Sequence, residues 1–426
     1  MGFEIPHIFC EKSELSYPME KLIQNDIEDR YTVALNPQNT IIFGNQITFH
    51  IEGSSDFVDL NATELMLSVR IIDADGNPML PEDLCSPINN ILHSMISQVD
   101  VSLKGTNVSA SHNNYHYLAY LYNLLNYGPD SKRTHLMNQG FVMDQAGRFD
   151  QRDNTAFIIR QKIFQDGNVM HFNGPLYSDI NQQPLLIPSN LDIRYTLTPS
   201  RQQLVLQNFS EKKFKIEIIT AQLLITMVKL FPERLAIFEK NISGSPIRIP
   251  ITQSRVTSFT IPRGLTSYSQ NGIFNGLLPK KNIFGFVSNA SYTGEYTKNP
   301  FHFKHYNLNY VQLKRGSKLY PTTPLLLDFA NNNFNRAYDS TFNITGQKFA
   351  DWSHGLTKND YKNGSSIFAF SLTDADCAHD ESLVYGSLDL NLRFAEALNE
   401  TVSLIVYSEI PANIIIDQFR NCLIDA

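Results

Sequence analysis

Residues 91–136 decide the fold of this chain. They contain, in series, ILHSMISQVDVSLKGTN (91–107), NNYHYLAY (113–120) and LLNYGP (124–129). In the first segment Val99, Val101 and Leu103 alternate with polar residues, and this pattern predicts a half-buried strand. The next four residues supply a turn, with Gly105 near its centre.

A short helix is predicted after this turn. Asn113 or Asn114 is suited to the position before its first turn, because a short polar side chain there can accept a hydrogen bond from a free backbone N–H group. The helix should end at Gly128-Pro129, since proline lacks the N–H that a further helical bond needs. Its predicted apolar face consists of Tyr115, Leu118, Tyr122 and Leu125.

The composition indicates an all-β protein with two domains. A single hydrophobic core rarely grows past about 250–300 residues, and this chain has 426. It contains 28 Phe and 19 Tyr but only 18% charged residues, and aromatic side chains favour pleated, half-buried surfaces.

The charge balance argues against a protein whose main task is to grip nucleic acid. The formal net charge is −7, whereas binding to phosphates requires clustered Lys and Arg. We interpret the few basic pairs, at 212–213, 280–281 and 314–315, as solvated loops. No strong direct binding of DNA is therefore expected.

Alternating apolar residues predict many short strands joined by turns. The clearest strands cover residues 47–51, 65–71 and 193–197, and the second of them ends in a turn at 73–78. Residues 1–40 show little periodicity and are interpreted as an extended arm. Further strands are predicted at 221–230, 247–251, 256–261, 387–394 and 402–410, and the Asn-rich segment 331–339 is interpreted as a long surface connection.

The second half of the chain repeats the pattern of the first. SLDLNLRF (387–394) matches NLDIRYTL (190–197), because each contains Leu-Asp and then alternates strictly. Another apolar strand follows in both halves, which fits two domains of like topology in tandem. The predicted units are an N-terminal arm (1–40), a first jelly roll (41–232), a helical linker (233–244) that starts just after Pro232, and a second jelly roll (245–426).

Two eight-stranded jelly rolls fit this strand count better than a closed up-and-down barrel. Jelly rolls occur in viral capsids, lectins and cupins. The fold alone therefore does not fix the function.

The motifs of residues 91–136 resemble those of the double jelly-roll major capsid protein, or hexon, of Polinton/Maverick elements and the related adintoviruses. The resemblance rests on SQVDV (97–101), the helix start NNYHY (113–117) and the stop LLNYGP (124–129). It continues more loosely through residues 221–230 and through 402–419, which contain IPAN (410–413).

The resemblance implies a structural protein of the virion, without enzyme activity, catalytic residues, cofactor or metal. Trimers with two jelly rolls per chain would have a pseudo-hexagonal outline and tile an icosahedral shell around double-stranded DNA. The implied partners are further copies of the chain, a single jelly-roll penton protein, and minor or cement proteins. Synthesis in the host cytoplasm and assembly in the host nucleus are also implied.

Residues able to carry chemistry have structural interpretations as well. No phosphate loop, dinucleotide fingerprint, nucleophile elbow or zinc-protease motif is present in the sequence. Residues 73–77 begin like a calcium loop, but Pro78 and Leu84 stand where Gly and Glu are required, so a turn is favoured. A second set is either a metal site or a polar loop, and it consists of Asp374, Asp376, Cys377, His379, Asp380 and Glu381.

The histidine spacings are weak evidence for a metal. His112 and His116 lie four apart, which can place both on one helical face, but capping or packing is favoured because no third ligand is near. His302 and His305, on a predicted strand, should point to opposite faces, which argues against a cupin-type site. Trp352 is predicted to pack in the core, with an interface anchor as the alternative.

The cysteines and the hydropathy indicate a reducing compartment and no membrane span. Cys10, Cys85, Cys377 and Cys422 lie far apart and form no CxxC pair, so they are interpreted as free thiols. The start of the chain lacks the basic-then-apolar order of a signal peptide. No run approaches the roughly 18–20 apolar residues of a membrane span.

Two other classes of function compete with a capsid protein. A carbohydrate- or receptor-binding β-sandwich requires a groove lined with aromatic residues and is usually secreted. A jelly-roll enzyme requires paired histidines or carboxylates on strands. The sequence favours the capsid protein over both.

Overall fold

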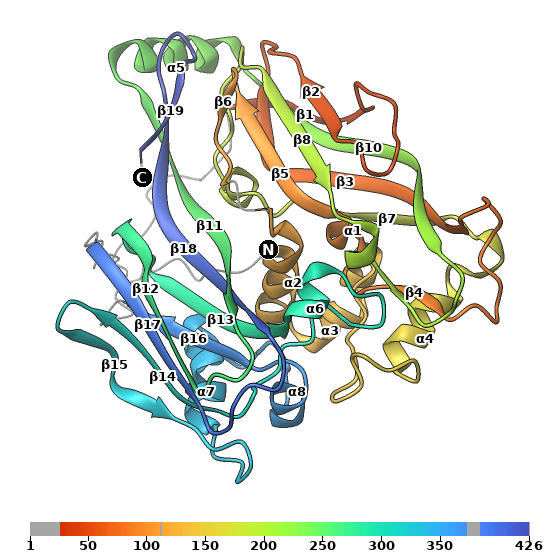
Figure 1. The fold of residues 1–426 in the computed structure, drawn as a ribbon. Coiled ribbons are helices and arrows are strands. Elements are labelled where there is room, and N and C mark those ends of the chain that lie inside the picture. The colour runs from red at the N-terminus through yellow and green to blue at the C-terminus, as the bar shows by residue number, and fades with distance from the viewer. Residues whose placement is uncertain (1–25, 111–112, 373–383, 426) are drawn as a thin grey trace.

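The computed structural model describes residues 26–110, 113–372 and 384–425. Within them the chain consists mainly of antiparallel strands, gathered in two bodies that lie side by side (Figure 1). The strands are β1 (Ile27–Leu35), β2 (Ile47–Ile51), β3 (Phe57–Asp73), β4 (Cys85–Pro87), β5 (Ile96–Leu103), β6 (Thr106–Asn107), β7 (Met170–Pro175), β8 (Ile193–Pro199), β9 (Leu206–Asn208), β10 (Phe214–Leu230), β11 (Ile247–Ile261), β12 (Ser267–Leu277), β13 (Lys281–Ser288), β14 (Leu308–Arg315), β15 (Lys318–Leu326), β16 (Ile367–Ser371), β17 (Tyr385–Phe394), β18 (Val402–Ile416) and β19 (Cys422–Asp425).

The helices are short and lie mostly in the connections between strands. They are α1 (Ile91–Ser94), α2 (Tyr115–Asn126), α3 (Pro129–Arg133), α4 (Thr155–Lys162), α5 (Pro232–Gly244), α6 (Asn289–Thr293), α7 (Asn335–Ile344) and α8 (Lys358–Lys362), with 3₁₀ turns that include η2 (His135–Gln139) and η4 (Asp179–Gln182). No helix in the described part of the chain is long and apolar enough to cross a membrane.

The same strand order occurs in both bodies. The sheets of the first have the orders β1-β10-β3-β7 and β2-β8-β5-β6, and those of the second have the orders β11-β18-β13-β16 and β12-β17-β14-β15. When the short β4–β9 pair and β19, which pairs with the end of β18, are left aside, the first, eighth, third and sixth strands form one sheet each time, and the remaining four form the other. This arrangement is a jelly roll, so the fold is all-β and a double jelly roll, as predicted. We call the two bodies the first roll and the second roll.

The sequence repeat is a structural repeat. Residues 190–197 and 387–394 contribute β8 and β17, the seventh strands of the two rolls. Asp192 Oδ1 accepts the backbone N–H of Gly53 at 2.9 Å, and Asp389 Oδ1 accepts that of Gly272 at 2.8 Å. The same carboxylate therefore ties the seventh strand to the chain at the second strand in both rolls.

Most predicted strands are confirmed. The segments 47–51, 65–71 and 193–197 lie in β2, β3 and β8. The two strands predicted at 247–251 and 256–261 form one continuous strand, β11, which pairs with β18 along its whole length.

The predicted arm is wrong for residues 27–35. They form β1 at the edge of a sheet, where it pairs with Leu223 to Leu230 of β10. Most of its side chains are exposed, so the sequence shows no apolar alternation there. Residues 1–25 lie outside the described residues. The domain limits predicted at 233–244 remain a proposal, although α5 begins at Pro232 as predicted.

The Asn-rich segment lies in the long connection between β15 and β16 and is mostly exposed, as predicted. Asp328 accepts hydrogen bonds from the backbone and the side chain of Asn331, at 3.0 and 2.7 Å, and so forms a turn. Helix α7 starts four residues later. This surface connection thus contains a turn and a helix.

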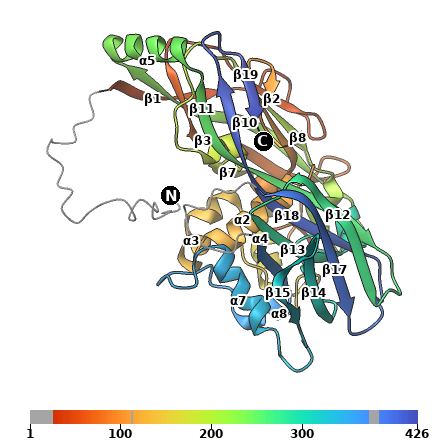
Figure 2. The same ribbon diagram turned by 90° about the vertical axis from the view of Figure 1, so that its left-hand side faces the viewer.

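One sheet of the second roll is buried on both faces along β13, most of β16 and the first half of β18. Along β18, Leu404 and Val406 belong to the core inside the second roll, whereas Ile405 between them joins the core that extends through the first roll. Helix α2 lies between the two rolls in both ribbon views (Figures 1 and 2). The seam between the rolls is therefore a continuous hydrophobic core rather than a flexible joint.

Candidate functional site

The seam between the rolls is organised by α2. Asn114 stands before its first turn, but its side chain does not cap the helix; its Nδ2 instead donates to the carbonyl of Val256 on β11, at 3.2 Å. The helix ends at Asn126, just ahead of Gly128-Pro129, as predicted. The N-terminal end of α2, for which a local cap is predicted, is therefore attached to the second roll instead.

Helix α2 is buried on all sides, so the prediction of a single apolar face is wrong. His116, Tyr117 and Tyr120 lie off that predicted face and are buried too. A helix that is covered all round belongs to the interior of a large core. The prediction assumed one packing partner, whereas α2 has a roll on either side.

Aromatic rings join α2 to the second roll. Tyr120 stacks on Phe301 with ring centroids 4.0 Å apart, and Tyr117 meets the same ring edge-on at 5.7 Å. Tyr117 also lies parallel to Tyr292, at 6.1 Å. Such pairs contribute about 0.5–1.5 kcal/mol each beyond the area they bury. The β6–β7 connection of the first roll, which contains α2, is thereby held on the β13–β14 connection of the second.

A buried polar network fixes the other side of α2. His93 contacts the hydroxyl of Tyr115 through Nδ1 at 3.1 Å and Gln139 Oε1 through Nε2 at 3.0 Å. Asn123 on α2 donates to the same Gln139 oxygen, and the Tyr177 hydroxyl donates to Asn123 Oδ1 at 2.6 Å. Burial lowers the pKa of His93 to about 3. The imidazole is therefore neutral at physiological pH and acts as a structural hydrogen-bonding group.

Two buried carboxylates also connect the rolls. Asp144 binds Arg160 at 2.8 Å and accepts a hydrogen bond from Asn299 of the second roll at 3.3 Å. Asp179 in η4 accepts the backbone N–H of Ser254 on β11 at 2.9 Å. Burial raises the pKa of Asp179 to about 7.

A lysine and a glutamine anchor the loop between α7 and α8 to the end of α2. Lys132 Nζ donates to the carbonyls of Leu124 and His354, each at 2.6 Å. Gln347 donates to the carbonyl of Leu125 at 2.7 Å and accepts the N–H of His354 at 2.7 Å. Burial lowers the pKa of Lys132 to about 7. The loop is therefore fixed at both ends by buried hydrogen bonds.

The same loop carries exposed aromatic side chains. Phe349 is 95% exposed and Trp352 is 47% exposed. The prediction that Trp352 packs in the core is wrong; the loop is anchored by its polar residues instead, and the indole faces outward. Its alternative role, as an interface anchor, remains a proposal.

The other residues singled out in the sequence have structural roles where they are described. Asp73 accepts N–H bonds from Asp75 and Asn77, so this segment is a turn as predicted. His116 is buried beside Tyr117, with ring centroids 4.6 Å apart. His112, the cluster at 374–381, Cys10 and Cys377 lie outside the described residues.

His302 and His305 do diverge, although the predicted strand is absent from residues 302–307. His302 Nδ1 lies 2.8 Å from Asp150 Oδ2, whereas His305 stacks on Phe329 at 4.1 Å. Cys85 and Cys422 are free thiols. Within the described ranges, no three His, Cys, Asp or Glu side chains are grouped so that they could hold a metal ion.

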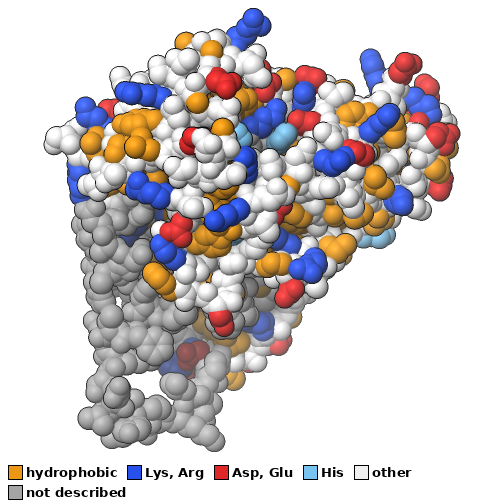
Figure 3. Space-filling view, turned by 90° about the horizontal axis from the view of Figure 1, so that it is seen from below, with side chains coloured by type: hydrophobic (Ala, Val, Ile, Leu, Met, Phe, Trp, Pro, Cys, Tyr) orange, Lys and Arg blue, Asp and Glu red, His pale blue; other side chains and the backbone are white. Residues whose placement is uncertain are grey.

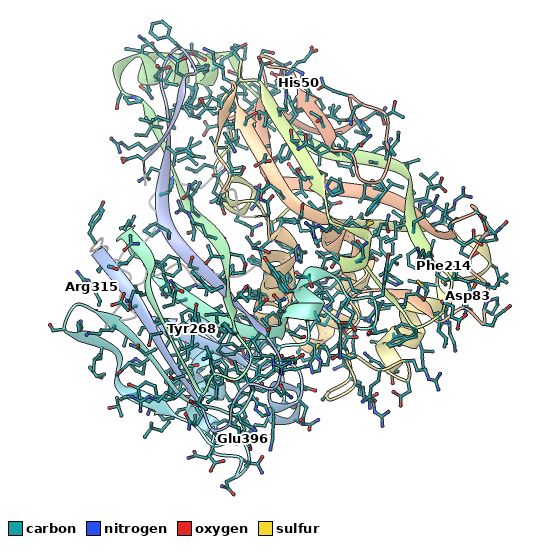
Figure 4. All side chains as sticks on the ribbon, viewed as in Figure 1. His50, Asp83, Phe214, Tyr268, Arg315 and Glu396 are labelled. Atoms are coloured by element: carbon teal, nitrogen blue, oxygen red, sulfur yellow. The ribbon has the colours of Figure 1, made fainter. Side chains whose placement is uncertain are left out.

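An open groove of about 490 Å³ lies where the first roll meets the loop after α6. Its lining includes the aromatic residues Phe43, Phe214 and Tyr296 and the cations Arg201 and Lys213. In Figure 4, Phe214 lies toward the same edge of the first roll as Asp83, and that carboxylate is paired with Lys212 at 2.8 Å. The sequence does not predict this groove, because its lining residues are spread over more than 250 positions, from Phe43 to Tyr296.

The charged side chains do not gather by sign on the face shown in Figure 3. Lys and Arg are intermixed with Asp and Glu over its described part. An even mixture of this kind gives no extended basic surface on which phosphates could collect.

The sequence is similar to a nematode protein but matches no family model. The chain is 26% identical over 392 residues to a Caenorhabditis elegans protein named "Uncharacterized protein F54H12.2", which covers 88% of this chain and 91% of that protein. This relative carries no functional description.

Solved viral structures are similar over nearly the whole chain. The TM-score is 0.65 with a chain of the Sputnik virophage structure, at 11% identity, covering 97% of this chain and 91% of that chain. It is 0.58 with the Faustovirus major capsid protein, at 9% identity and 98% and 94% coverage, and 0.55 with the mavirus major capsid protein, at 12% identity and 99% and 94% coverage. At these identities the likeness establishes the double jelly-roll fold.

Proposed function

We propose that this chain is the major capsid protein of an icosahedral virion that encloses double-stranded DNA. Three chains form a capsomer with a pseudo-hexagonal outline, and capsomers tile the shell. The proposed group is that of the Polinton/Maverick elements and adintoviruses, and the resemblance of residues 91–136 supports this choice. The role is structural, without catalysis, cofactor or metal.

The observation that carries this proposal is the pair of rolls with one strand order, fused through a buried helix. Six similar rolls from three chains can close a ring and fill a plane, while fusion in one chain lets the two rolls differ toward their neighbours. The continuous core around α2 suits this task, because a shell subunit must keep the angle between its two rolls. The similar structures include the major capsid proteins of mavirus and Faustovirus, and this likeness supports the same proposal.

The proposed partners follow from a closed icosahedral shell. They are further copies of this chain, a single jelly-roll penton protein at the five-fold vertices, and minor or cement proteins. The proposed location is the virion, after synthesis in the host cytoplasm and assembly in the host nucleus.

Light scattering and electron microscopy of the purified chain test the capsomer. We expect about three times the chain mass of 48.5 kDa at micromolar concentration, and pseudo-hexagonal particles in negative stain. A monomer that persists at every concentration and salt condition would contradict the proposal.

Direct binding of DNA is expected to be weak. The net charge is −7, and the charges intermix on the face in Figure 3. In a gel-shift titration at near-physiological salt, the trimer should leave duplex DNA unretarded at submicromolar protein. Retardation that weakens steeply with salt would instead reveal a basic surface.

The groove gives a second candidate function, that of a carbohydrate- or receptor-binding module. Aromatic side chains beside Arg201 and Lys213 suit an acidic sugar, because rings stack on sugars and cations bind carboxylates or sulfates. A glycan array with the wild-type chain and an Arg201→Ala/Lys213→Ala variant tests this. Binding that the variant loses, by a chain that stays monomeric, would favour this function over the capsid.

A further inference from the structure

The two rolls carry corresponding insertions between their fifth and sixth strands. In the first roll the β6–β7 connection contains α2, and in the second roll the β15–β16 connection contains α7, α8 and the loop at 345–357 between these helices. Because the rolls share one strand order, these insertions leave their rolls at equivalent places.

The insertion of the first roll is covered by the next roll of the same chain. Tyr117 and Tyr120 are buried against Phe301 and Phe303, which lie between the third and fourth strands of the second roll. The rule inside the chain is thus that aromatic residues of one roll's insertion pack on the third-to-fourth-strand connection of the roll that follows.

Among the described residues, no third roll covers the insertion of the second roll. Its exposed aromatic residues, Phe349 and Trp352, are nevertheless held in place. Gln347 and His354 are anchored on α2 and Lys132 by buried hydrogen bonds. Lys348, paired with Asp339 at 2.6 Å, lies 5.9 Å from the centroid of the Phe349 ring. A fixed loop that presents bare aromatic rings loses little entropy on binding and suits an interface anchor.

We propose that Phe349 and Trp352 pack on the first roll of a second copy of this chain. The inference rests on the proposed trimer and extends it to a particular contact. By the rule inside the chain, the receiving surface is the third-to-fourth-strand connection of the first roll, residues 74–95. That connection exposes the apolar side chain of Leu80, which is 40% exposed.

The contact is heterologous, because the loop of one copy meets a different surface of the next. Such a contact closes into a ring when the rotation between copies is a fraction of a full turn. Three copies then give six alternating rolls, with every fifth-to-sixth-strand insertion covered by a roll. The exposure of Phe349 in a single chain is explained by the missing neighbour.

Association of a loop variant tests the proposal. The Phe349→Ser/Trp352→Ser chain should associate at least tenfold more weakly than the wild type in light scattering over a dilution series. Leu423→Ser is the matched control, since this side chain is 61% exposed on β19, outside the insertion, and should leave association unchanged. Far-UV circular dichroism and thermal unfolding check that both variants fold.

The possible results separate the contact from the proposed function. A double variant that forms trimers with wild-type concentration dependence overturns the contact and leaves the capsid proposal intact. A wild-type chain that never associates overturns the capsid proposal, and the contact with it.

Cross-linking identifies the receiving surface without relying on a destabilised variant. We co-express chains that carry Trp352→Cys with chains that carry Leu80→Cys and treat them with a short bis-maleimide. The wild-type chain, treated in the same way, gives the background of cross-links from the native cysteines. A product of two chain masses should form in the mixed trimers and in neither variant alone. Mixed trimers without that product would overturn the pairing with the 74–95 connection.

Discussion

The two rolls share a strand order but differ in what covers the sheet of their first, eighth, third and sixth strands. In the second roll β13 and the first half of β18 are buried on both faces, while β11 at the edge of the same sheet alternates between buried and accessible side chains. In the first roll the outer face is open at several places, where Tyr31, Met66 and Ile219 are 40%, 36% and 41% exposed. The strand order therefore sets the roll, whereas the neighbour sets the pattern of side chains along each strand.

This difference explains the short, polar character of β1. Its counterpart β11 has 15 residues, and the sequence predicted two strands there; β1 has nine residues, most of them exposed. The first strand of the first roll stands at a sheet edge, and no further strand of the described residues pairs with it. Its stability must come from backbone pairing with β10 rather than from burial.

Removal of β1 should have the largest effect. Deletion of residues 1–35 leaves β10 without the partner of Leu223 to Leu230, and we expect loss of soluble folded protein. Deletion of residues 1–25 keeps β1 and is the matched control. Soluble yield and circular dichroism measure both. If the chain with the longer deletion is folded and unfolds at the wild-type temperature, β1 is dispensable. Residues 27–35 would then act as part of an arm, as the sequence predicts.

Truncation of two matched isoleucines should give the next largest difference. Ile405 on β18 and Ile219 on β10 both lie on eighth strands, but they are 1% and 41% exposed. Ile405→Ala should cost about 2–5 kcal/mol of unfolding free energy, as for buried large-to-small changes. Ile219→Ala should cost less than about 1 kcal/mol in the monomer, because its surface is already in water. Denaturant unfolding measures both, and equal losses would refute the contrast between the two sheets.

The seam should depend on pH through Asp179. Its folded pKa of about 7 lies above the ordinary value of 3.8, because burial penalises the carboxylate. The protonated carboxyl thus contributes stability that is fully present below about pH 4 and is lost as the pH rises through about 7. The loss amounts to up to roughly 4 kcal/mol.

Asp179→Asn is the test of this pH dependence. The amide oxygen can still accept the N–H of Ser254, so the variant should match the wild type near pH 4 and exceed it near pH 8. Chemical unfolding at several pH values gives the comparison. A variant with the same pH profile as the wild type would show that other groups set the profile.

The smallest effect is expected on the open face of the first roll. Arg70 and Glu217 pair across β3 and β10, and both side chains are 40% exposed. Water and salt screen such a pair, so Arg70→Ala should change the unfolding free energy by less than about 1 kcal/mol. A double-mutant cycle with Glu217→Ala isolates the pair, and a coupling well above this value would mean that the face is covered.

Sequence could predict what depends on local pattern. The strands at 47–51 and 193–197 are confirmed because one of their faces is buried and the other is not, which produces strict alternation. The Leu-Asp repeat is confirmed for a chemical reason, since Asp192 and Asp389 each bind a glycine N–H at the same place in the roll. A tandem pair of rolls could be predicted from these features together with the family resemblance.

Sequence could not predict what depends on distant neighbours. Tyr120 lies off the predicted apolar face of α2, and it is buried because Phe301, far along the chain, stacks against it. Trp352 is predicted to pack in the core, yet it is exposed on a loop that is anchored by Gln347 and Lys132. In both cases the deciding contact joins the two rolls, and no local pattern encodes it.

The aromatic stack on α2 also bears on how the chain is made. A ribosome adds roughly 5–20 residues each second, and Phe301 emerges well over 150 residues after Tyr120. For roughly 10–40 s the nascent first roll displays the tyrosines of α2 with nothing to cover them. Synthesis of this protein therefore passes through an intermediate with an exposed apolar helix, and chaperones must shield that helix from aggregation until the second roll folds.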